Sequence, residues 1–547
     1  MRIQAGIWTA VLAMLLAATP LTASADPGQD RGRGAENRSE RADAALEAAQ
    51  ALFSPRTKGE AQDDPHGRRT TGEQHSDHAT LVLRDLVLGY DDLDPADQKV
   101  ARSILARPTD GKDDPWPGVK YRGAPTSNTC AVLDGVERRV CLHWVTDPSN
   151  VNAPPLGGQD EHGVPAWVRT NQQVFEEVWQ RIVVQLGYRA PRSDAGSANP
   201  GPDGRTDIYL AELSGYGMYG YCTRDEPGEQ ALFCVIDNDF AERMYGGSAK
   251  ALRVTAAHEF FHAIQFGYTM RADSWVMEGT AAWIEDEVYD HINDNLQFLE
   301  LSPLRAPHFP MDYGPAEQYN WLYGSWIWWR FLTEKFGKAD APDPTVVRDV
   351  WQRLGNGAGT FPAQRRAIAA RGGDFGRAFA DFGAVNRIAG RWYDEGGSYT
   401  RFVAPPASRI SLSRKRPATG WRSQKLYHLS SKHVVLRPGK GIRGKWRLRV
   451  NLDLPPRFRG SQATAIVHRK DGGVRLVRAR LDKQGDGRLV VPFNRRHIAR
   501  VTLSLTNAST RTGKCRQGSP FTCGGWSPDS GRDFDGLVFA FRARALN

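Results

Sequence analysis

Apolar residues recur at two different periods along this chain, and the change of period divides it into two parts. Between residues 121 and 400, apolar side chains mostly return every three or four positions, as they do in residues 167–186, which indicates amphipathic helices. Beyond about residue 405 the pattern changes. In residues 446–454 apolar and polar side chains alternate strictly, which indicates a strand with one buried face.

The first part predicts a mixed α/β unit that becomes helical toward its end. Short apolar runs predict strands at residues 140–145, 207–210 and 233–237. The third of these strands precedes a helix-forming apolar segment, and we expect it to form a sheet edge that can pair with an extended peptide. Helical spacing predicts further helices at residues 344–354, 362–371 and 375–388.

The second part, residues 405–547, predicts an antiparallel β-sandwich of seven or eight strands. Asp471-Gly472-Gly473 supplies a tight turn and predicts a hairpin between residues 463–469 and 474–481. This part contains 31 Lys and Arg, 7 Asp and no Glu, a net charge of +24, whereas the rest of the chain has 41 Lys and Arg against 55 Asp and Glu, or −14. Such a basic domain is expected to bind a polyanion, for example an anionic cell-wall polymer. A basic surface that serves only solubility is the alternative.

Residues 1–25 have the parts of a secretory signal peptide. Arg2 gives a positive start, residues 7–18 form an apolar core too short to span a bilayer comfortably, and Ala23-Ser24-Ala25 fits a cleavage site. We therefore expect export by the general secretory (Sec) route, cleavage after Ala25 and a secreted, extracellular protein of bacterial type. Because no second long apolar run follows, a transmembrane anchor is not expected.

Two segments precede the α/β unit. Residues 26–78 are polar and nearly free of aromatic side chains, which predicts a disordered or weakly helical segment. Residues 79–120 are predicted to be helical, because Asp94-Pro95 provides an N-cap and a first-turn proline for a helix that ends near Ala106. These segments form either a propeptide or an ordinary helical cap on the domain that follows.

The six cysteines fall into three close pairs: Cys130 and Cys141, Cys222 and Cys234, and Cys515 and Cys523. Neighbour pairing into three local disulfides is the prediction for an exported chain. A cysteine zinc site would need C-x-x-C spacings, which the sequence lacks.

The residues most typical of catalysis lie in an apolar segment around residues 256–264. His258, Glu259 and His262 form an H-E-x-x-H motif there, and Gly267 is the predicted C-cap of the helix. Histidines four positions apart share one face of a helix, where both imidazoles can bind one zinc ion. Glu259 is then placed to act on a water bound to that ion.

A catalytic zinc ion needs a third protein ligand and one open position. A second helix is predicted after the first, and its Glu278 stands 16 positions beyond His262. A chain that turns and returns antiparallel can bring this carboxylate to the two imidazoles, so Glu278 is the predicted third ligand. Glu285 lies two turns further along and is predicted to accept a hydrogen bond from a ligand histidine. For Asp286 and Glu287, a solvated acidic face is expected at least as much as such a supporting role.

This set of residues resembles the gluzincin metallopeptidases, in which a Glu on a following helix completes the metal site. The resemblance rests on the H-E-x-x-H motif followed by W-x-x-E-G-T-A at residues 275–281, and it spans about residues 130–336. More narrowly, the chain resembles a group of secreted bacterial metallopeptidases that carry both motifs. It implies a zincin-like α+β catalytic domain over residues 121–400, with a mixed sheet and an active-site helix before a helical lower half. It also implies one catalytic Zn2+ held by His258, His262 and Glu278, with Glu259 as the catalytic base.

Gluzincins commonly use a Tyr or a His to stabilise the oxyanion. Tyr323 is the predicted donor because it opens an amphipathic helix over residues 321–336. Tyr319 and Tyr268 are the other candidates, and a packing role is the alternative for each of them.

Two acidic clusters are candidates for Ca2+, which stabilises many secreted peptidases. Asp237 and Asp239 form the first, for which an Asp-Asn-Asp turn is the simpler explanation. Asp529, Asp533 and Asp535 form the second, for which an acidic turn is again the alternative.

Together these features predict a secreted zinc metalloendopeptidase of the gluzincin type (EC 3.4.24). It would hydrolyse a peptide or protein substrate with Glu259 activating a zinc-bound water, and its basic sandwich would target an anionic surface. One alternative is a non-catalytic adhesion or binding protein with a structural zinc site, although such a site has no use for Glu259. Another alternative is a zinc hydrolase of cell-wall peptide amides.

Overall fold

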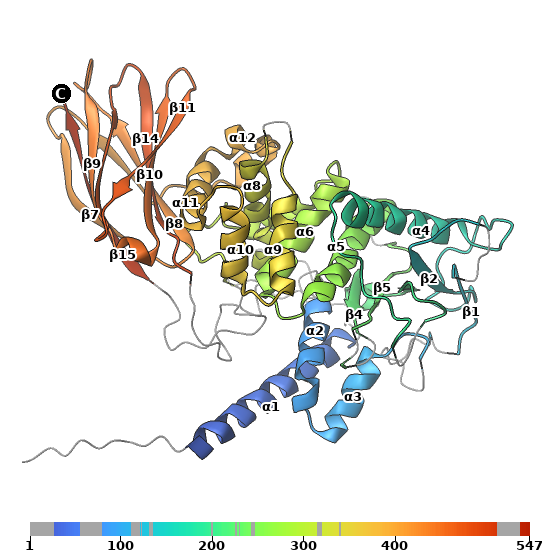
Figure 1. The fold of residues 1–547 in the computed structure, drawn as a ribbon. Coiled ribbons are helices and arrows are strands. Elements are labelled where there is room, and N and C mark those ends of the chain that lie inside the picture. Colours follow the sequence, from blue (N-terminus) through green and yellow to red (C-terminus); the bar gives the residue numbers. More distant parts are fainter. Residues whose placement is uncertain are drawn as a thin grey trace, which may run out of the picture.

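The computed structural model describes residues 27–54, 79–110, 121, 123–130, 135–197, 201–224, 227–228, 230–241, 247–313, 320–338, 341–510 and 536–547, with side chains of the first helix from residue 38 onward. These residues form a mixed α+β structure with three five-stranded sheets, mostly antiparallel and none of them closed. In Figure 1 the front helices lie below an α/β region, a block of helices follows, and the C-terminal sheets lie at the far end. None of the described helices is long and apolar enough to cross a membrane.

The first sheet has the strand order β1-β2-β3-β5-β4. Its strands are β1 (Thr126–Asn128), β2 (Val140–Val145), β3 (Thr206–Ala211), β4 (Gly220–Thr223) and β5 (Phe233–Asp237). β2, β3 and β5 run parallel, and β1 and β4 are antiparallel strands at the two edges. Every residue of the three parallel strands is buried, as expected where other elements cover both faces of a sheet. The three predicted strands of this region are confirmed.

The position of the sheet edge differs from the prediction. β5, the strand that was expected to form the edge, lies between β3 and β4, and the edge belongs to β4. β4 has only four residues inside a segment rich in glycine and tyrosine. A strand this short shows no alternating pattern, so the sequence did not reveal it.

Helices pack on this sheet through one continuous apolar core. The first is α4 (Ala166–Trp179), which continues over Gln180–Gln185 as a π-helical segment, and the second is α5 (Ser248–Tyr268). The predicted C-cap at Gly267 is wrong, because α5 includes Tyr268 and is capped by Thr269 in extended conformation. The left-handed conformation for which a C-terminal glycine is favoured is not used here.

α6 (Ser274–Tyr289) returns against α5 and also packs on α7 (Asn320–Gly324) and α8 (Trp326–Phe336). The single helix predicted over residues 321–336 is thus two helices, which Ser325 separates. α6 lies close to Ser325 at Gly279, where an added Cβ would lie 2.1 Å from the Ser325 Oγ. This contact explains why glycine follows Glu278.

The solvated acidic face expected at the end of α6 is wrong. Asp286 is buried and pairs with Arg330 of α8 at 2.8 Å, and Glu287 lies 3.5 Å from the same guanidinium. Burial raises the pKa of Asp286 to about 7 although Arg330 opposes the shift. The sequence could not show that a cation from a helix 40 residues further along would cover this face.

The remaining helices agree with the predicted ones. They are α9 (Thr345–Gly355), α10 (Thr360–Ala369) and α11 (Phe375–Val385), followed by the short α12 (Ala389–Trp392) and α13 (Gly396–Tyr399). Their apolar faces join the core that α4, α5 and α6 form on one face of the first sheet. The other face of that sheet packs in a second core, which it shares with the front segment.

The front segment consists of α1 (Pro27–Leu52), α2 (Ala79–Gly89) and α3 (Pro95–Leu105). α1 lies where a disordered or weakly helical segment was expected. Ala42, Leu46 and Ala49 of this helix, and Phe53 directly after it, recur every three or four positions and are buried in a core shared with α2. This burial compensates for an otherwise polar composition. The N-cap of α3 is confirmed, because the Asp94 side chain accepts hydrogen bonds from two backbone amides of the first turn.

The C-terminal residues form two five-stranded sheets with one apolar core between them. The first has the order β11-β10-β14-β8-β6 and the second β12-β13-β9-β15-β7. The strands are β6 (Ser408–Leu412), β7 (Ala418–Leu426), β8 (Ser430–Pro438), β9 (Arg447–Asp453), β10 (Ser461–Arg469), β11 (Val474–Arg478), β12 (Arg480–Leu481), β13 (Asp486–Pro492), β14 (Ile498–Asn507) and β15 (Leu537–Leu546). All pairs are antiparallel except β6 with β8. The alternating strand and the hairpin β10–β11 are confirmed, and two or three more strands are present than predicted.

These sheets are fixed to the helical region through α11, which packs on β8, β10 and β14. Asp381 of α11 accepts hydrogen bonds from Arg478 and from Lys335, each at 2.7 Å. His433 of β8 donates to the Gly383 carbonyl at 2.7 Å. Burial lowers the pKa of His433 to about 3, so this histidine is a neutral donor at the junction.

Two of the three predicted disulfides, Cys130–Cys141 and Cys222–Cys234, are present. Disulfides of this kind are typical of an oxidising, extracellular environment. The predicted signal peptide, the pair Cys515 and Cys523, and the acidic cluster at residues 529–535 lie outside the described residues.

The close contact at Gly279 makes a first prediction. Gly279→Ala should lower the free energy of unfolding by about 1–3 kcal/mol, because the added methyl group must displace Ser325 and separate α6 from α7 and α8. Gly397→Ala is the matched control, since a Cβ there meets nothing within 4 Å. Urea denaturation of both variants measures the difference in the free energy of unfolding. Equal stabilities would contradict the close contact between Gly279 and Ser325.

Candidate metal centre

The H-E-x-x-H motif lies in the middle of α5, which is buried along most of its length. His258 and His262 stand one helical turn apart, with ring centroids separated by 4.7 Å and planes inclined by 76°. Their Nε2 atoms are 3.0 Å apart. Both imidazoles therefore present a nitrogen to the same small space.

Glu278 reaches this space from α6. Its Oε2 lies 3.2 Å from the His258 Nε2 and 3.4 Å from the His262 Nε2. The residue is fully buried. Burial alone would raise the pKa of the Glu278 carboxyl, but the two facing imidazoles outweigh that effect and hold the pKa well below its usual range. The carboxylate is thus kept ionised, which is the form that binds a metal.

The three groups fit a divalent metal ion. Donor atoms at these separations leave a point about 2.0–2.1 Å from each of them, slightly off their common plane, and zinc binds histidine and carboxylate at that distance. The second oxygen of Glu278, Oε1, is buried and has no hydrogen-bond partner among the described residues. Buried polar atoms are rarely left without a partner, so a further group such as a metal ion is expected in this space beside Glu278.

Each histidine is oriented through its other ring nitrogen. The His258 Nδ1 lies 2.6 Å from Oε1 of Glu285, which is the supporting contact expected from the sequence. The His262 Nδ1 lies 2.8 Å from Oε1 of Gln265, whose amide nitrogen in turn donates to the Met277 carbonyl. Carboxylate and amide partners of this kind fix the tautomer and the ring orientation of metal-binding histidines. Sequence reasoning missed Gln265, although its position one turn after His262 was a usable signal.

Glu259 lies beside this group but is not part of it. The space next to its side chain is formed by Gly220 of β4, where an added Cβ would lie 3.0 Å from the Glu259 Cγ. Its Oε2 accepts a hydrogen bond of 2.7 Å from the hydroxyl of Thr80 in α2. Sequence reasoning did not single out Thr80, which is 179 residues away from Glu259 along the chain.

Of the three tyrosine candidates, the structure brings Tyr323 to the site. Its ring stacks on His258 with a centroid distance of 5.5 Å and an angle of 15°. Tyr268 is not brought to the site, because its hydroxyl accepts a hydrogen bond from the Arg189 backbone amide at 3.0 Å and its ring packs near Tyr188. Tyr319 lies outside the described residues.

A small pocket of ≈40 Å³ opens beside the metal group. His258, Glu259, Glu285 and Tyr323 line it together with residues of β4 and of the segment after α6. Asp294 in that segment is also part of the lining, and burial raises its pKa to about 6. The candidate base Glu259, the ligand His258 and Tyr323 thus share one pocket, and His262 and Glu278 lie behind His258.

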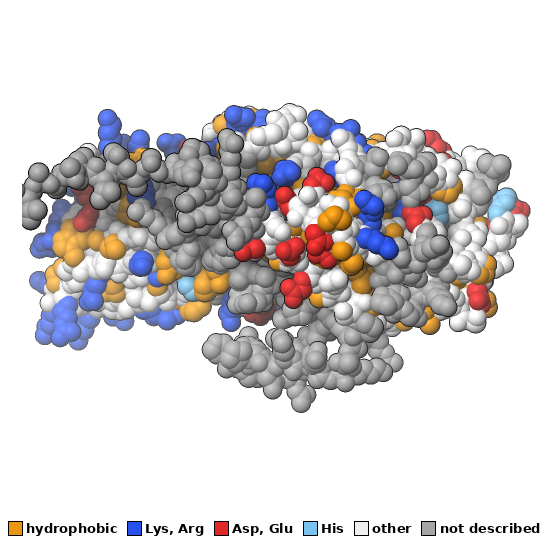
Figure 2. All heavy atoms as spheres, turned by 90° about the horizontal axis from the view of Figure 1, so that it is seen from below, with side chains coloured by type: hydrophobic (Ala, Val, Ile, Leu, Met, Phe, Trp, Pro, Cys, Tyr) orange, Lys and Arg blue, Asp and Glu red, His pale blue; other side chains and the backbone are white. Residues whose placement is uncertain are grey.

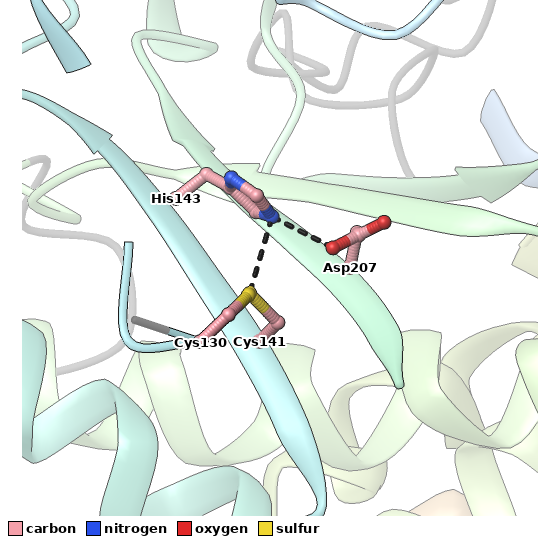
Figure 3. Close-up of side chains that lie close together, drawn as sticks. All are labelled: Cys130, Cys141, His143 and Asp207. Atoms are coloured by element: carbon pink, nitrogen blue, oxygen red, sulfur yellow. Dashed lines mark hydrogen bonds and ion pairs between the residues drawn. A yellow bond between two sulfur atoms is a disulfide. The ribbon is translucent and has the colours of Figure 1, made fainter. Parts of the chain in front are cut away.

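A second group of potential ligands is already satisfied. Cys141 and His143 of β2, Asp207 of β3 and Cys130, which follows β1, come together as Figure 3 shows. The cysteines form a disulfide, and the His143 Nε2 lies 2.7 Å from the Asp207 Oδ1. Asp207 also pairs with Arg107. This group is a buried cluster of hydrogen bonds and ion pairs that ties the front segment to the sheet.

The calcium candidate at Asp237 is also accounted for by protein contacts. Asp237 is buried, and its two oxygens accept hydrogen bonds from the backbone amides of Leu213, Asp239 and Phe240. Burial raises its pKa to about 7. This geometry is that of the Asp-Asn-Asp turn, so the first calcium candidate is not supported.

Comparison with known proteins does not identify a family for this chain. No protein-family model matches this chain, and no curated protein matches it. The similarity to gluzincins stays an expectation from the motif residues.

The contact between Glu285 and His258 makes a second prediction. Glu285→Ala should weaken zinc binding about 10–100-fold, because His258 loses the partner that orients its ring. Glu300→Gln is the control, since the Glu300 side chain is exposed and does not line the pocket. Competition with a chromophoric chelator measures the affinity. Unchanged zinc binding in Glu285→Ala would contradict the supporting role.

Proposed function

We propose that this chain is a secreted zinc metallopeptidase that cleaves within peptide or protein chains. The observation that supports the proposal best is the position of Glu259. This carboxylate lines the same pocket as His258 and yet is not one of the three candidate ligands. A structural metal site does not need such a group, whereas hydrolysis needs a base.

The arrangement of elements also supports a zincin-like domain of the gluzincin type. Both histidines lie on α5, which packs on the sheet beside the antiparallel edge strand β4. The third candidate ligand comes from the next helix, α6. An edge strand next to the site can pair with an extended peptide through backbone hydrogen bonds, which suits a peptidase that is tolerant of sequence.

In this proposal His258, His262 and Glu278 hold the zinc ion. The ion, when bound, supplies Lewis acidity that polarises a carbonyl group and brings the pKa of water toward ~7. Glu259 accepts the proton of the attacking water and delivers it to the leaving amine. Tyr323, stacked on His258, donates its hydroxyl to the developing oxyanion. Glu285 and Gln265 keep the two imidazoles in register.

The role of Glu259 gives a third prediction. Glu259→Gln should lower kcat/KM about 10²–10⁴-fold, because the amide cannot take up the proton, while the zinc content stays at one ion per chain. Hydrolysis of casein and of cell-wall peptide is measured beside zinc analysis, with Glu300→Gln as control. Activity on cell-wall peptide alone would favour the amide hydrolase. Proteolysis that survives chelation or this substitution would contradict the mechanism.

The C-terminal sheets support a polyanion as partner. Figure 2 shows Lys and Arg side chains gathered over this end of the molecule, with Asp and Glu side chains nearer the middle of the same face. A groove of ≈1170 Å³ lies between the helical region and the sheets. It is lined by five arginines: Arg365, Arg377, Arg457, Arg459 and Arg480. Among the described residues, one acidic residue lines the groove, Asp374, which caps α11. An exposed aromatic ring, Phe458, lies at the groove and offers an apolar contact.

The groove makes a fourth prediction. Replacing Arg457, Arg459 and Arg480 together by Gln should weaken binding to heparin about ten-fold at low salt, since exposed charge pairs each contribute up to about 1 kcal/mol. The effect should shrink as salt screens the charges. Replacing Arg422, Arg443 and Arg488 by Gln removes the same charge elsewhere on the sheets. Equal losses in the two triple variants would mean that net charge, and not the groove, governs binding.

A further inference from the structure

The front segment reaches into the candidate metal centre through α2. Thr80 is the second residue of this helix and is buried. Its hydroxyl donates to the Glu259 Oε2 at 2.7 Å and accepts from the backbone amide of Cys222 in β4 at 2.9 Å. One side chain thus engages both the proposed base and the edge strand.

The amide that Thr80 occupies is one that a substrate would use. Cys222 is paired with Cys234 of β5, and the Cα atoms are only 4.0 Å apart. Such a short distance is typical of a non-hydrogen-bonded antiparallel pair, whose amides point away from the partner strand. The Cys222 N–H therefore faces the side of the sheet where an added strand would lie, and Thr80 caps it there.

α2 also covers the edge strand itself, because it packs on β4. The pocket of ≈40 Å³ beside Glu259 has room for water, which needs about 10–15 Å³ on this measure. A polypeptide cannot lie along β4 while α2 is in place.

Several buried contacts hold the front segment in this position. Arg84 of α2 is buried and donates to the Ser274 hydroxyl and to the Met277 sulfur, each at 3.2 Å, on the helix that carries Glu278. Arg107, after α3, pairs with Asp194 at 3.0 Å and with Asp207. The contacts of α2 and α3 are thus made to the metal-site helices and to the sheet.

We propose that α2 is a built-in inhibitor that occupies the substrate edge of this enzyme and sequesters Glu259, so that activity requires α2 to be displaced or removed. The description of the edge as a substrate site rests on the proposed function. That α2 blocks binding at this edge does not rest on the proposed function, because the affinity for a peptide hydroxamate can be measured without any hydrolysis.

The test uses the full chain with a specific protease sequence inserted in residues 111–120, so that cleavage separates α2 and α3 from the α/β region. The matched control carries the same insertion in residues 55–78, where cleavage leaves α2 attached. Three quantities are measured before and after cleavage: zinc content, affinity for a peptide hydroxamate, and hydrogen exchange of the β4 amides. Hydrolysis of casein is followed in parallel.

Cleavage in residues 111–120 should raise hydroxamate affinity about ten-fold or more and speed exchange at Cys222, since a ligand no longer competes with the hydrogen bonds of Thr80 to Glu259 and Cys222. Cleavage in residues 55–78 should change neither. Equal affinity of the intact and cleaved chains, or loss of zinc without any gain in affinity, would overturn the proposal. Tighter hydroxamate binding and faster amide exchange without hydrolysis of casein would still show that α2 blocks the site. That result would contradict the proposed peptidase activity instead.

A second variant covers the case in which the cleaved chain does not stay folded. Thr80→Val keeps the shape of the side chain but removes both hydrogen bonds. In the intact, zinc-loaded protein it should speed exchange of the Cys222 amide and strengthen hydroxamate binding. If both quantities match those of the unmodified chain, Thr80 does not restrain the site and the proposal fails.

Discussion

The fully buried carboxylate of Glu278 is the constraint on which the structure depends. Placing an ionised group inside an apolar core costs several kcal/mol unless it is paired. Here the compensation comes from two imidazoles within 3.4 Å, and a metal ion would complete it. These partners are on α5, so α6 must pack against α5 in the one register that brings Glu278 to both imidazoles. The packing of α6 on α7 and α8 keeps it in that register.

The sequence W-x-x-E-G-T-A can be understood residue by residue from this constraint. Trp275 stacks on Trp329 of α8 at a centroid distance of 5.8 Å. Gly279 lets α6 approach Ser325. Thr280 accepts hydrogen bonds from Trp351 and from Gln265, the residue that also orients His262. Arg330 pairs with Asp286, the residue next to Glu285. The motif is therefore a packing motif as much as a ligand motif, because most of its residues position Glu278 and only Glu278 is a candidate metal ligand.

Local patterns predicted most of the fold, and contacts that are distant in sequence account for what they missed. The strands of residues 140–145 and 233–237, the capped α3 and the alternating β9 were all visible, since each carries its signal within ten residues. The three ligand candidates could be named because two share a helix face and the third follows 16 residues later. The edge strand β4 was too short to be seen, and α1 was hidden by its polar composition. Thr80 at Glu259 and Arg330 at Asp286 depend on tertiary packing, for which one sequence has no signal.

The central claim is that one zinc ion is held by two imidazoles and a carboxylate on α5 and α6. X-ray absorption at the zinc edge, on the purified full chain, tests it most directly. The account predicts two imidazole nitrogens and at least one further oxygen at about 2.0–2.2 Å, with no sulfur in the first shell. A shell of sulfur at about 2.3 Å would move the metal to cysteines such as Cys130 and Cys141 and would contradict the account.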